Sequence, residues 1–187
     1  MFSKPEIRSA MRTTRDAHVA ALPDSVRRLA FSRAASPLAR LYVPGRTVAA
    51  YVAMGSEPDP AALLAEAAAA GCRTALPHVT GTAAPMRFLH WSPGDPLEAG
   101  PFGLRQPRAN ADVAMPDLVL VPLVAFDDAL NRLGQGAGHY DRALSLLPDA
   151  IAIGIAWSVQ QVDALPADPW DAPLDAVLTE RSWILPS

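Results

Sequence analysis

The segment "LVPLVAFDDALNRLGQGAGHYDRAL" (residues 120–144) decides how the chain folds, because it passes from an apolar run through a glycine-rich loop into a helix-like stretch. The apolar run begins three residues earlier, as "DLVLVPLVAF" (117–126), and has the length and composition of a strand buried on both faces. The stretch from about His139 to Leu147 is predicted to be helical. A buried strand followed by a glycine loop and a helix is typical of an α/β sheet.

Other apolar runs in the chain extend this pattern. Strand-length runs rich in Val, Ile, Leu and Ala occupy residues 47–54, 73–77, 86–91 and 150–157. The alanine-rich residues 61–70 are predicted to form a helix closed by Gly71. We therefore expect an α/β fold in which a largely parallel central sheet has helices on both faces. With 187 residues, the chain is expected to form a single domain over residues 1–187.

The N-terminal residues predict a helix with an unusual charged face. Ser3 and Glu6 have the spacing of a capping box, so a helix is expected from about Lys4 to Leu22. On such a helix four cations share one face: Lys4, Arg8, Arg12 and Arg15. Like charges at these spacings oppose helix formation. The face is therefore either a solvated basic surface or a stripe that binds an anion, and the spacing leaves both open.

Composition excludes several classes of protein. A net charge of −3 gives no overall basic field, so we expect no nucleic-acid partner. No apolar run approaches the roughly 18 residues that span a bilayer, so no membrane association is expected. The single cysteine, Cys72, cannot form an internal disulfide. We expect a cytoplasmic protein that acts as a monomer; a transit peptide in residues 1–20 is the less favoured alternative, because it would contain Glu6 and Asp16.

The glycine-rich loop has the chemistry of a phosphate-binding site. Alternating glycines let backbone N–H groups approach an anion, and the N-terminus of the following helix adds positive potential. Arg132 precedes the loop and could contact phosphate, while Asp141 could reach phosphate through Mg²⁺. The alternative is a flexible loop in which Asp141 only stabilises the helix dipole.

Familiar catalytic motifs do not match this loop. A Walker A loop would need a lysine after its glycines, and a Rossmann fingerprint would need glycine at His139. The sequence also lacks a Gly-x-Ser-x-Gly elbow, a His-Glu-x-x-His pair and a zinc spacing among its four histidines.

Residues 120–144 closely resemble the hallmark segment of the 5-formyltetrahydrofolate cyclo-ligase family, in which an Ala-Phe-Asp turn leads into Arg-Leu-Gly-x-Gly-x-Gly-Tyr-Tyr-Asp. Weaker similarities follow in the same order along almost the whole chain: "KPEIR" (4–8), "SEPDP" (56–60), "LPHV" (76–79), "FGLRQP" (102–107) and "LDAVLTE" (174–180). The resemblance implies an enzyme that uses ATP and Mg²⁺ to convert 5-formyltetrahydrofolate into 5,10-methenyltetrahydrofolate, releasing ADP and phosphate. It further implies that the formyl oxygen is phosphorylated first. Phosphoryl transfer depends on positioning and charge neutralisation, which an arginine-flanked glycine loop can supply.

The resemblance also implies residue roles. Arg132 and Tyr140 would be catalytic, and Asp141 and Asp175 would bind Mg²⁺. The expected nucleotide site comprises Lys4, Arg8, Arg132, Gly134, Gln135, Gly136, Ala137, Gly138, His139 and Tyr140.

The folate pocket implied by the resemblance contains Val52, Glu57, Phe102, His139 and Tyr140. Glu57 would accept paired hydrogen bonds from the amino-pyrimidinone edge of the pterin. Each assignment has a structural alternative: Glu57 as a surface charge, Asp175 as a turn residue, and Val52 and Phe102 as core residues.

One departure from the family motif leaves a second function open. His139 occupies the position of the first tyrosine of Tyr-Tyr-Asp, and its charge could change near pH 6.5. A folate- or nucleotide-binding paralogue that has lost turnover is therefore an alternative. A different enzyme on the same scaffold, such as a phosphosugar isomerase, is a third, and it would not require ATP.

Overall fold

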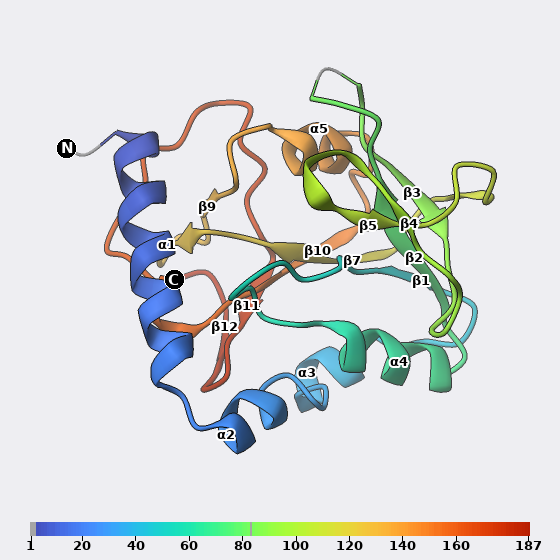
Figure 1. Cartoon of the computed structure of the whole chain (residues 1–187), viewed down its shortest axis with the longest axis horizontal. Coiled ribbons are helices and arrows are strands. Elements are labelled where there is room, and N and C mark those ends of the chain that lie inside the picture. Colours follow the sequence, from blue (N-terminus) through green and yellow to red (C-terminus); the bar gives the residue numbers. More distant parts are fainter. Residues whose placement is uncertain (1–2, 83) are drawn as a thin grey trace.

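The computed structural model describes residues 3–82 and 84–187 and is organised around one eight-stranded sheet (Figure 1). Its strand order is β12-β11-β10-β7-β1-β2-β3-β6. The strands are β1 (Thr47–Ala49), β2 (Arg73–His78), β3 (Arg87–His90), β6 (Val113–Ala114), β7 (Leu118–Pro122), β10 (Ile151–Ile155), β11 (Ala176–Leu178) and β12 (Trp183–Ile184).

The centre of the sheet is parallel, as predicted. Strands β11, β10, β7, β1 and β2 pair in parallel, whereas β3, β6 and β12 join the edges in antiparallel register. In β7, Leu118 and the two following residues have no exposed surface, which explains why the sequence of a central strand is apolar throughout rather than alternating.

Helices cover both faces of the sheet, which confirms the predicted α/β class. They are α1 (Lys4–Ala21), α2 (Asp24–Leu29), α3 (Ser36–Ala39), α4 (Ala61–Ala69) and α5 (His139–Ser145). Leu38 of α3 and Leu63 of α4 pack in one core cluster beneath the sheet. Ala143 and Leu144 of α5 pack in a second cluster on the opposite face (Figure 1). No helix within the described residues is long and apolar enough to span a membrane.

The first helix begins as the sequence predicts. The backbone N–H of Ser3 donates to the Glu6 carboxylate at 2.7 Å, and α1 continues to Ala21, one residue short of the predicted end. Only Arg15 and Val19 are buried along its length. The helix therefore flanks the sheet instead of packing within the core (Figure 1).

Two predicted strands are shorter than expected. The run 117–126 breaks after Pro122, which has no N–H for the ladder, and its last residues form β8 (Ala125–Phe126), paired with β9 (Arg132–Leu133). The run 47–54 is a strand only as far as Ala49. Beyond that point the chain leaves the sheet at its carboxyl edge.

The long proline-rich connection at residues 92–107 contains regular structure that the sequence did not predict. It forms the small hairpin β4 (Glu98–Ala99) and β5 (Arg105–Gln106), joined through the 3-10 turn η1 (Pro101–Gly103). Phe102 at the tip has a positive φ of 59°, an uncommon conformation for an aromatic residue.

Candidate active site

A cavity of about 1370 Å³ opens at the carboxyl ends of the parallel strands. Pro122 ends β7, and Tyr51 and Val52 follow β1; all three line the cavity. From β1 the chain continues to β2 on one side, whereas β7 and β10 lie on the other. The cavity therefore lies where the strand order reverses, which is where open α/β sheets usually bind ligands.

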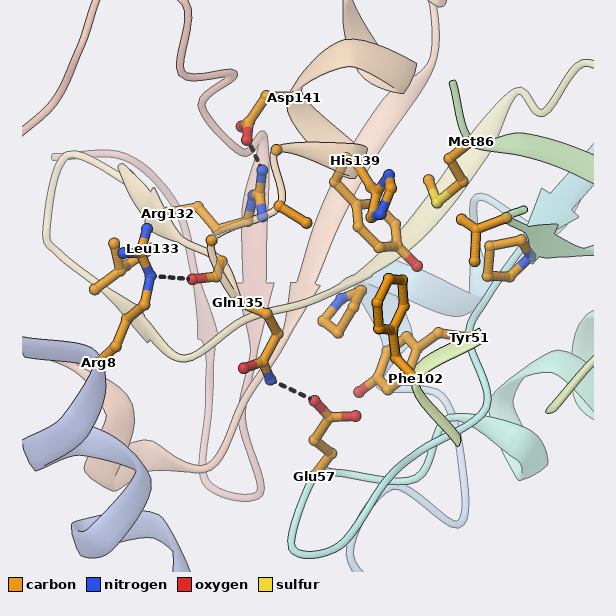
Figure 2. Close-up of a pocket in the computed structure, with 18 of the residues that line it drawn as sticks. Arg8, Tyr51, Glu57, Met86, Phe102, Arg132, Leu133, Gln135, His139 and Asp141 are labelled. Carbon is orange, nitrogen blue, oxygen red and sulfur yellow. Dashed lines mark hydrogen bonds and ion pairs between the residues drawn. The ribbon is translucent and has the colours of Figure 1, made fainter. Parts of the chain in front are cut away.

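The glycine-rich loop forms one wall of this cavity. Gly136 and Gly138 have φ values of 111° and 64°, which L residues rarely adopt. A Cβ at Gly134 would lie 2.7 Å from Nη1 of Arg132. Arg8 of α1 donates from Nε to the Gly134 carbonyl at 2.8 Å (Figure 2). The glycines are thus required both by backbone conformation and by close packing of arginine side chains.

Arg132 and Asp141 form an ion pair beside the loop. Nη2 of Arg132 donates to Oδ1 of Asp141 at 2.5 Å, and only 2% of the arginine side chain is exposed. The guanidinium carbon lies 5.9 Å from the centroid of the Tyr140 ring, and Nε is buried with no hydrogen-bond partner among the described residues. A buried guanidinium with a free donor is suited to an anionic ligand.

The cationic face of α1 follows the cavity along its length, with a partner at each turn. Lys4 contacts Asp168 and Asp171 at 2.7 and 2.6 Å. Arg8 contacts Gly134, and Nη2 of Arg12 donates to Gln135 at 2.6 Å. Nε of Arg15 donates to Ser56 at 2.8 Å. All four cations line the cavity, which favours an anion-binding stripe over a solvated surface.

Glu57 lies at the far end of this stripe from Lys4. Its carboxylate accepts a hydrogen bond from Nε2 of Gln135 at 2.9 Å (Figure 2). It accepts another from the backbone N–H of Met54 at 3.0 Å. Nη1 of Arg15 lies 4.0 Å away, and 10% of the Glu57 side chain is exposed. Hydrogen bonds therefore fix the Glu57 carboxylate inside the cavity, and Glu57 is not a free surface charge.

Aromatic side chains surround the space next to Glu57. Tyr51, Phe102 and His139 converge there with Met86 (Figure 2). Phe102 is 60% exposed, so it is a rim residue and not part of the core. Burial raises the pKa of Tyr140, so the phenol stays protonated. Its hydroxyl has no hydrogen-bond partner in residues 3–82 and 84–187 and can therefore donate to a ligand.

His139 begins α5 at the junction of loop and aromatic space. Its Nδ1 lies 3.3 Å from Nη2 of Arg142. Burial, together with the Arg142 charge, lowers the pKa of His139 below its ordinary value of 6.5. The ring is therefore neutral at physiological pH, and its buried Nε2 has no partner within the described residues.

Asp175 does not lie with Asp141. It precedes β11, where its carboxylate accepts a hydrogen bond from the backbone N–H of Ala152 at 2.7 Å, and it does not line the cavity. The amino ends of β10 and β11 are at the opposite edge of the sheet from the glycine loop, because all the central strands run the same way. The structure does not bring Asp175 beside Asp141, so the Mg²⁺ ion that the two were expected to share stays a prediction.

Sequence reasoning missed a different pair of carboxylates, Asp168 and Asp171, in the connection that follows β10. Both line the cavity and contact Lys4. The backbone N–H of Ala172, next to Asp171, points to Oδ1 of Asp141 at 3.4 Å. The sequence does contain a signal for this pair, because both residues follow a parallel strand. A connection that leaves the carboxyl end of such a strand begins at the edge where ligands bind. The described residues contain no cluster of three or more His, Cys, Asp or Glu side chains arranged to hold a metal by themselves.

The chain is similar to known proteins over almost its whole length. Residues 1–180 match the model of the 5-formyltetrahydrofolate cyclo-ligase family. The 5-formyltetrahydrofolate cyclo-ligase of Mycolicibacterium smegmatis is 35% identical over 190 residues, covering 97% of each chain, and that of Escherichia coli K12 is 33% identical over 144 residues, covering 73% of this chain and 79% of the other. The solved structure of Aquifex aeolicus 5,10-methenyltetrahydrofolate synthetase superposes with a TM-score of 0.74 at 29% identity, covering 97% of this chain and 92% of that one.

Proposed function

Because the chain belongs to the 5-formyltetrahydrofolate cyclo-ligase family and is an enzyme of that kind, we propose that it closes 5-formyltetrahydrofolate to 5,10-methenyltetrahydrofolate at the expense of ATP, with Mg²⁺ bound at this cavity. One observation carries the proposal: the glycine loop, flanked by Arg132 and Asp141, shares a single cavity with the held carboxylate of Glu57. The glycine loop and the aromatic side chains next to Glu57 therefore line the same cavity, which supports binding of phosphate and pterin side by side.

The folate occupies the aromatic end in this proposal. Glu57 accepts two hydrogen bonds from the amino-pyrimidinone edge of the pterin, in place of those it now receives from Gln135 and Met54. Phe102 and Tyr51 border the ring system, and Val52 contributes apolar surface. The neutral ring of His139 fits beside an uncharged pterin better than an imidazolium would.

The triphosphate lies along the glycine loop. Backbone N–H groups between Gly134 and Gly138 contact its oxygens, and Arg8 supplies positive charge from α1. Arg132 has a free Nε donor for the group in transfer. These donors are fixed before the ligand arrives, which is the arrangement that stabilises charge developing in phosphoryl transfer.

The proposed reaction has two steps. The formyl oxygen attacks the γ-phosphorus, the bond to the β-phosphate oxygen breaks, and ADP leaves. N10 then attacks the formyl carbon, the carbon–oxygen bond breaks, and inorganic phosphate departs with that oxygen. The proton on N10 is released to water in this step. Tyr140, protonated and next to Arg132, donates a hydrogen bond at the reacting centre.

Asp141 and Asp171 are the carboxylates that would hold Mg²⁺. Their donor set fits this ion, because Mg²⁺ is usually bound by one or two carboxylates together with phosphate oxygens and water. About a fifth of each side chain is exposed, at 21% for Asp141 and 17% for Asp171. Arg132 pairs with Asp141 and Lys4 pairs with Asp171. When bound there, the ion would neutralise charge on the nucleotide phosphates.

The decisive experiment combines purified protein with 5-formyltetrahydrofolate, Mg²⁺ and ATP, and follows methenyltetrahydrofolate absorbance together with phosphate release. We expect both products in equal amounts and neither when ATP is omitted. Product formation without ATP would contradict the ATP dependence. Binding of ATP and folate without any turnover would instead favour the non-catalytic paralogue.

A further inference from the structure

Trp170 is the most conspicuous side chain of the cavity for which the proposed reaction has no role. It is 72% exposed, as much as any large apolar residue described, and it lines the cavity. Exposing an indole to water is unfavourable by the hydrophobic effect. Its place at the rim of a ligand cavity, unlike that of the equally exposed Leu29, puts this indole within reach of a bound ligand.

The turn that carries Trp170 is held firmly in place. The backbone N–H of Asp171 donates to the Asp168 carbonyl at 3.0 Å, and the backbone N–H of Asp168 donates to the Asp171 carboxylate at 2.8 Å. Lys4 contacts both carboxylates. These contacts fix the backbone on both sides of Trp170, so the indole is presented from a rigid support.

Helix α1 shows which part of a nucleotide reaches this turn. Arg15 lies at the Glu57 end of the cavity, Arg8 at the glycine loop, and Lys4 at the turn of residues 168–171. The phosphate in transfer must meet the folate formyl group at the glycine loop. The rest of the nucleotide must then extend away from Glu57, past Arg8 toward Lys4, a distance of about 6 Å along the helix axis.

We propose that Trp170 is the platform on which the base of the nucleotide stacks. This inference rests on the proposed use of ATP. The indole face covers one face of the base, and burial of both apolar surfaces provides the binding energy. Stacking tolerates any base, so Trp170 would increase affinity for the nucleotide as a whole more than it would discriminate between purines.

Two variants and one control test this role by calorimetric titration with ATP. Trp170→Ala should raise the Kd for ATP about 5- to 50-fold, whereas Trp170→Phe, which retains an aromatic face, should stay within about threefold of the wild type. Leu29→Ala is the matched control, because Leu29 is also 72% exposed but does not line the cavity. Inorganic tripolyphosphate, which has no base, should bind all four proteins equally.

Fluorescence gives an independent measurement. The other three tryptophans, Trp91, Trp157 and Trp183, do not line the cavity, so quenching of emission by ATP should occur in the wild type and be largely lost in Trp170→Phe. In turnover assays Trp170→Ala should raise the KM for ATP and leave kcat and the KM for folate unchanged. If the wild type turns over with ATP and Trp170→Ala has an unchanged ATP affinity, this inference alone is overturned. A wild type that makes product without ATP would overturn the proposed function as well.

Discussion

Arg132 and Asp141 neutralise each other beside the glycine loop, in an ion pair whose arginine side chain is almost fully buried. The pair joins β9 to α5 across the loop and keeps a cation and a carboxylate within reach of the same ligand. Breaking a buried pair on one side leaves the other charge without a partner. The roles of the two residues can therefore be separated by substituting each of them.

Replacement of Arg132 by alanine should lower kcat about 100- to 1000-fold, the usual loss when a donor that stabilises transferred charge is removed. The Kd for 5-formyltetrahydrofolate should change little, because Glu57 and the aromatic residues are intact. Arg132→Lys retains the charge and should recover only part of the activity, since lysine cannot reproduce the guanidinium fork. Unchanged ATP-dependent turnover in the alanine variant would remove Arg132 from the mechanism.

Carboxylate substitutions test the magnesium site. Asp141→Asn and Asp171→Asn should each raise the Mg²⁺ concentration needed for half-maximal activity, because each removes a charged ligand. Asp175→Ala should leave the Mg²⁺ titration unaltered and lower the free energy of unfolding by about 1 kcal/mol, since it loses the bond to the Ala152 N–H. A shifted Mg²⁺ titration for the Asp175 variant would restore the original assignment.

Gly134 tests the packing of the loop against Arg132. A Cβ at this position must displace the guanidinium, so Gly134→Ala should lower kcat about ten- to a hundredfold by misplacing it. Gly81→Ala is the control, because nothing lies within 4 Å of a Cβ there. Equal activity of the two variants would show that Arg132 adapts to the added methyl group.

Glu57 should govern folate affinity selectively. Glu57→Gln removes the charge that accepts hydrogen bonds from the pterin and should raise the Kd for 5-formyltetrahydrofolate about tenfold, with the Kd for ATP unchanged. Asp59→Asn alters a carboxylate of the same segment that caps Ala61 outside the cavity, so its folate affinity should equal that of the wild type. Calorimetric titration of each ligand separates these outcomes.

The pKa of His139 makes the stability of the fold depend on pH. The dependence has the opposite sign to that caused by a histidine paired with a carboxylate. Because the folded-state pKa lies below 6.5, the ring is neutral in both folded and unfolded protein above that pH, and stability is unaffected there. As the pH falls below 6.5, the unfolded state binds the proton first and stability decreases. Proton NMR of the His139 ring should give a midpoint below 6.5, and the wild type to His139→Tyr activity ratio should be constant above that pH. A midpoint above 6.5 would contradict the burial argument.

The sequence was sufficient for the fold class, because that depends on local signals, whereas the phosphate-binding role of the loop stays a prediction. Apolar runs of strand length and the capping box at Ser3 act over a few residues, and the structure confirms them. The strand over 117–126 was predicted too long, since periodicity does not register the missing N–H of Pro122. The single-domain organisation, the monomeric state and the cytoplasmic location stay predictions.

The candidate site was less predictable where it depends on long-range placement. Asp171 and Asp175 both follow β10 and are only four residues apart, yet one lines the cavity and the other caps β10 at the opposite edge. Motif spacing does not distinguish the two residues, because the chain between them runs from the carboxyl edge of the sheet to its amino edge. The exposed Trp170 was missed for the same reason: nothing in its immediate sequence shows that α1 lies beside it.

The contacts of Lys4 join residues 164 and 167 positions apart in the chain. During synthesis the N-terminal helix emerges first, but Asp168 and Asp171 leave the ribosome only after nearly the whole sheet has been translated. A nascent chain stalled before residue 168 would therefore display a cationic helix without its acidic counterpart. Such a chain should be more sensitive to proteolysis at α1 than a chain that includes residues 168–171, because the cavity wall formed by these residues is still missing.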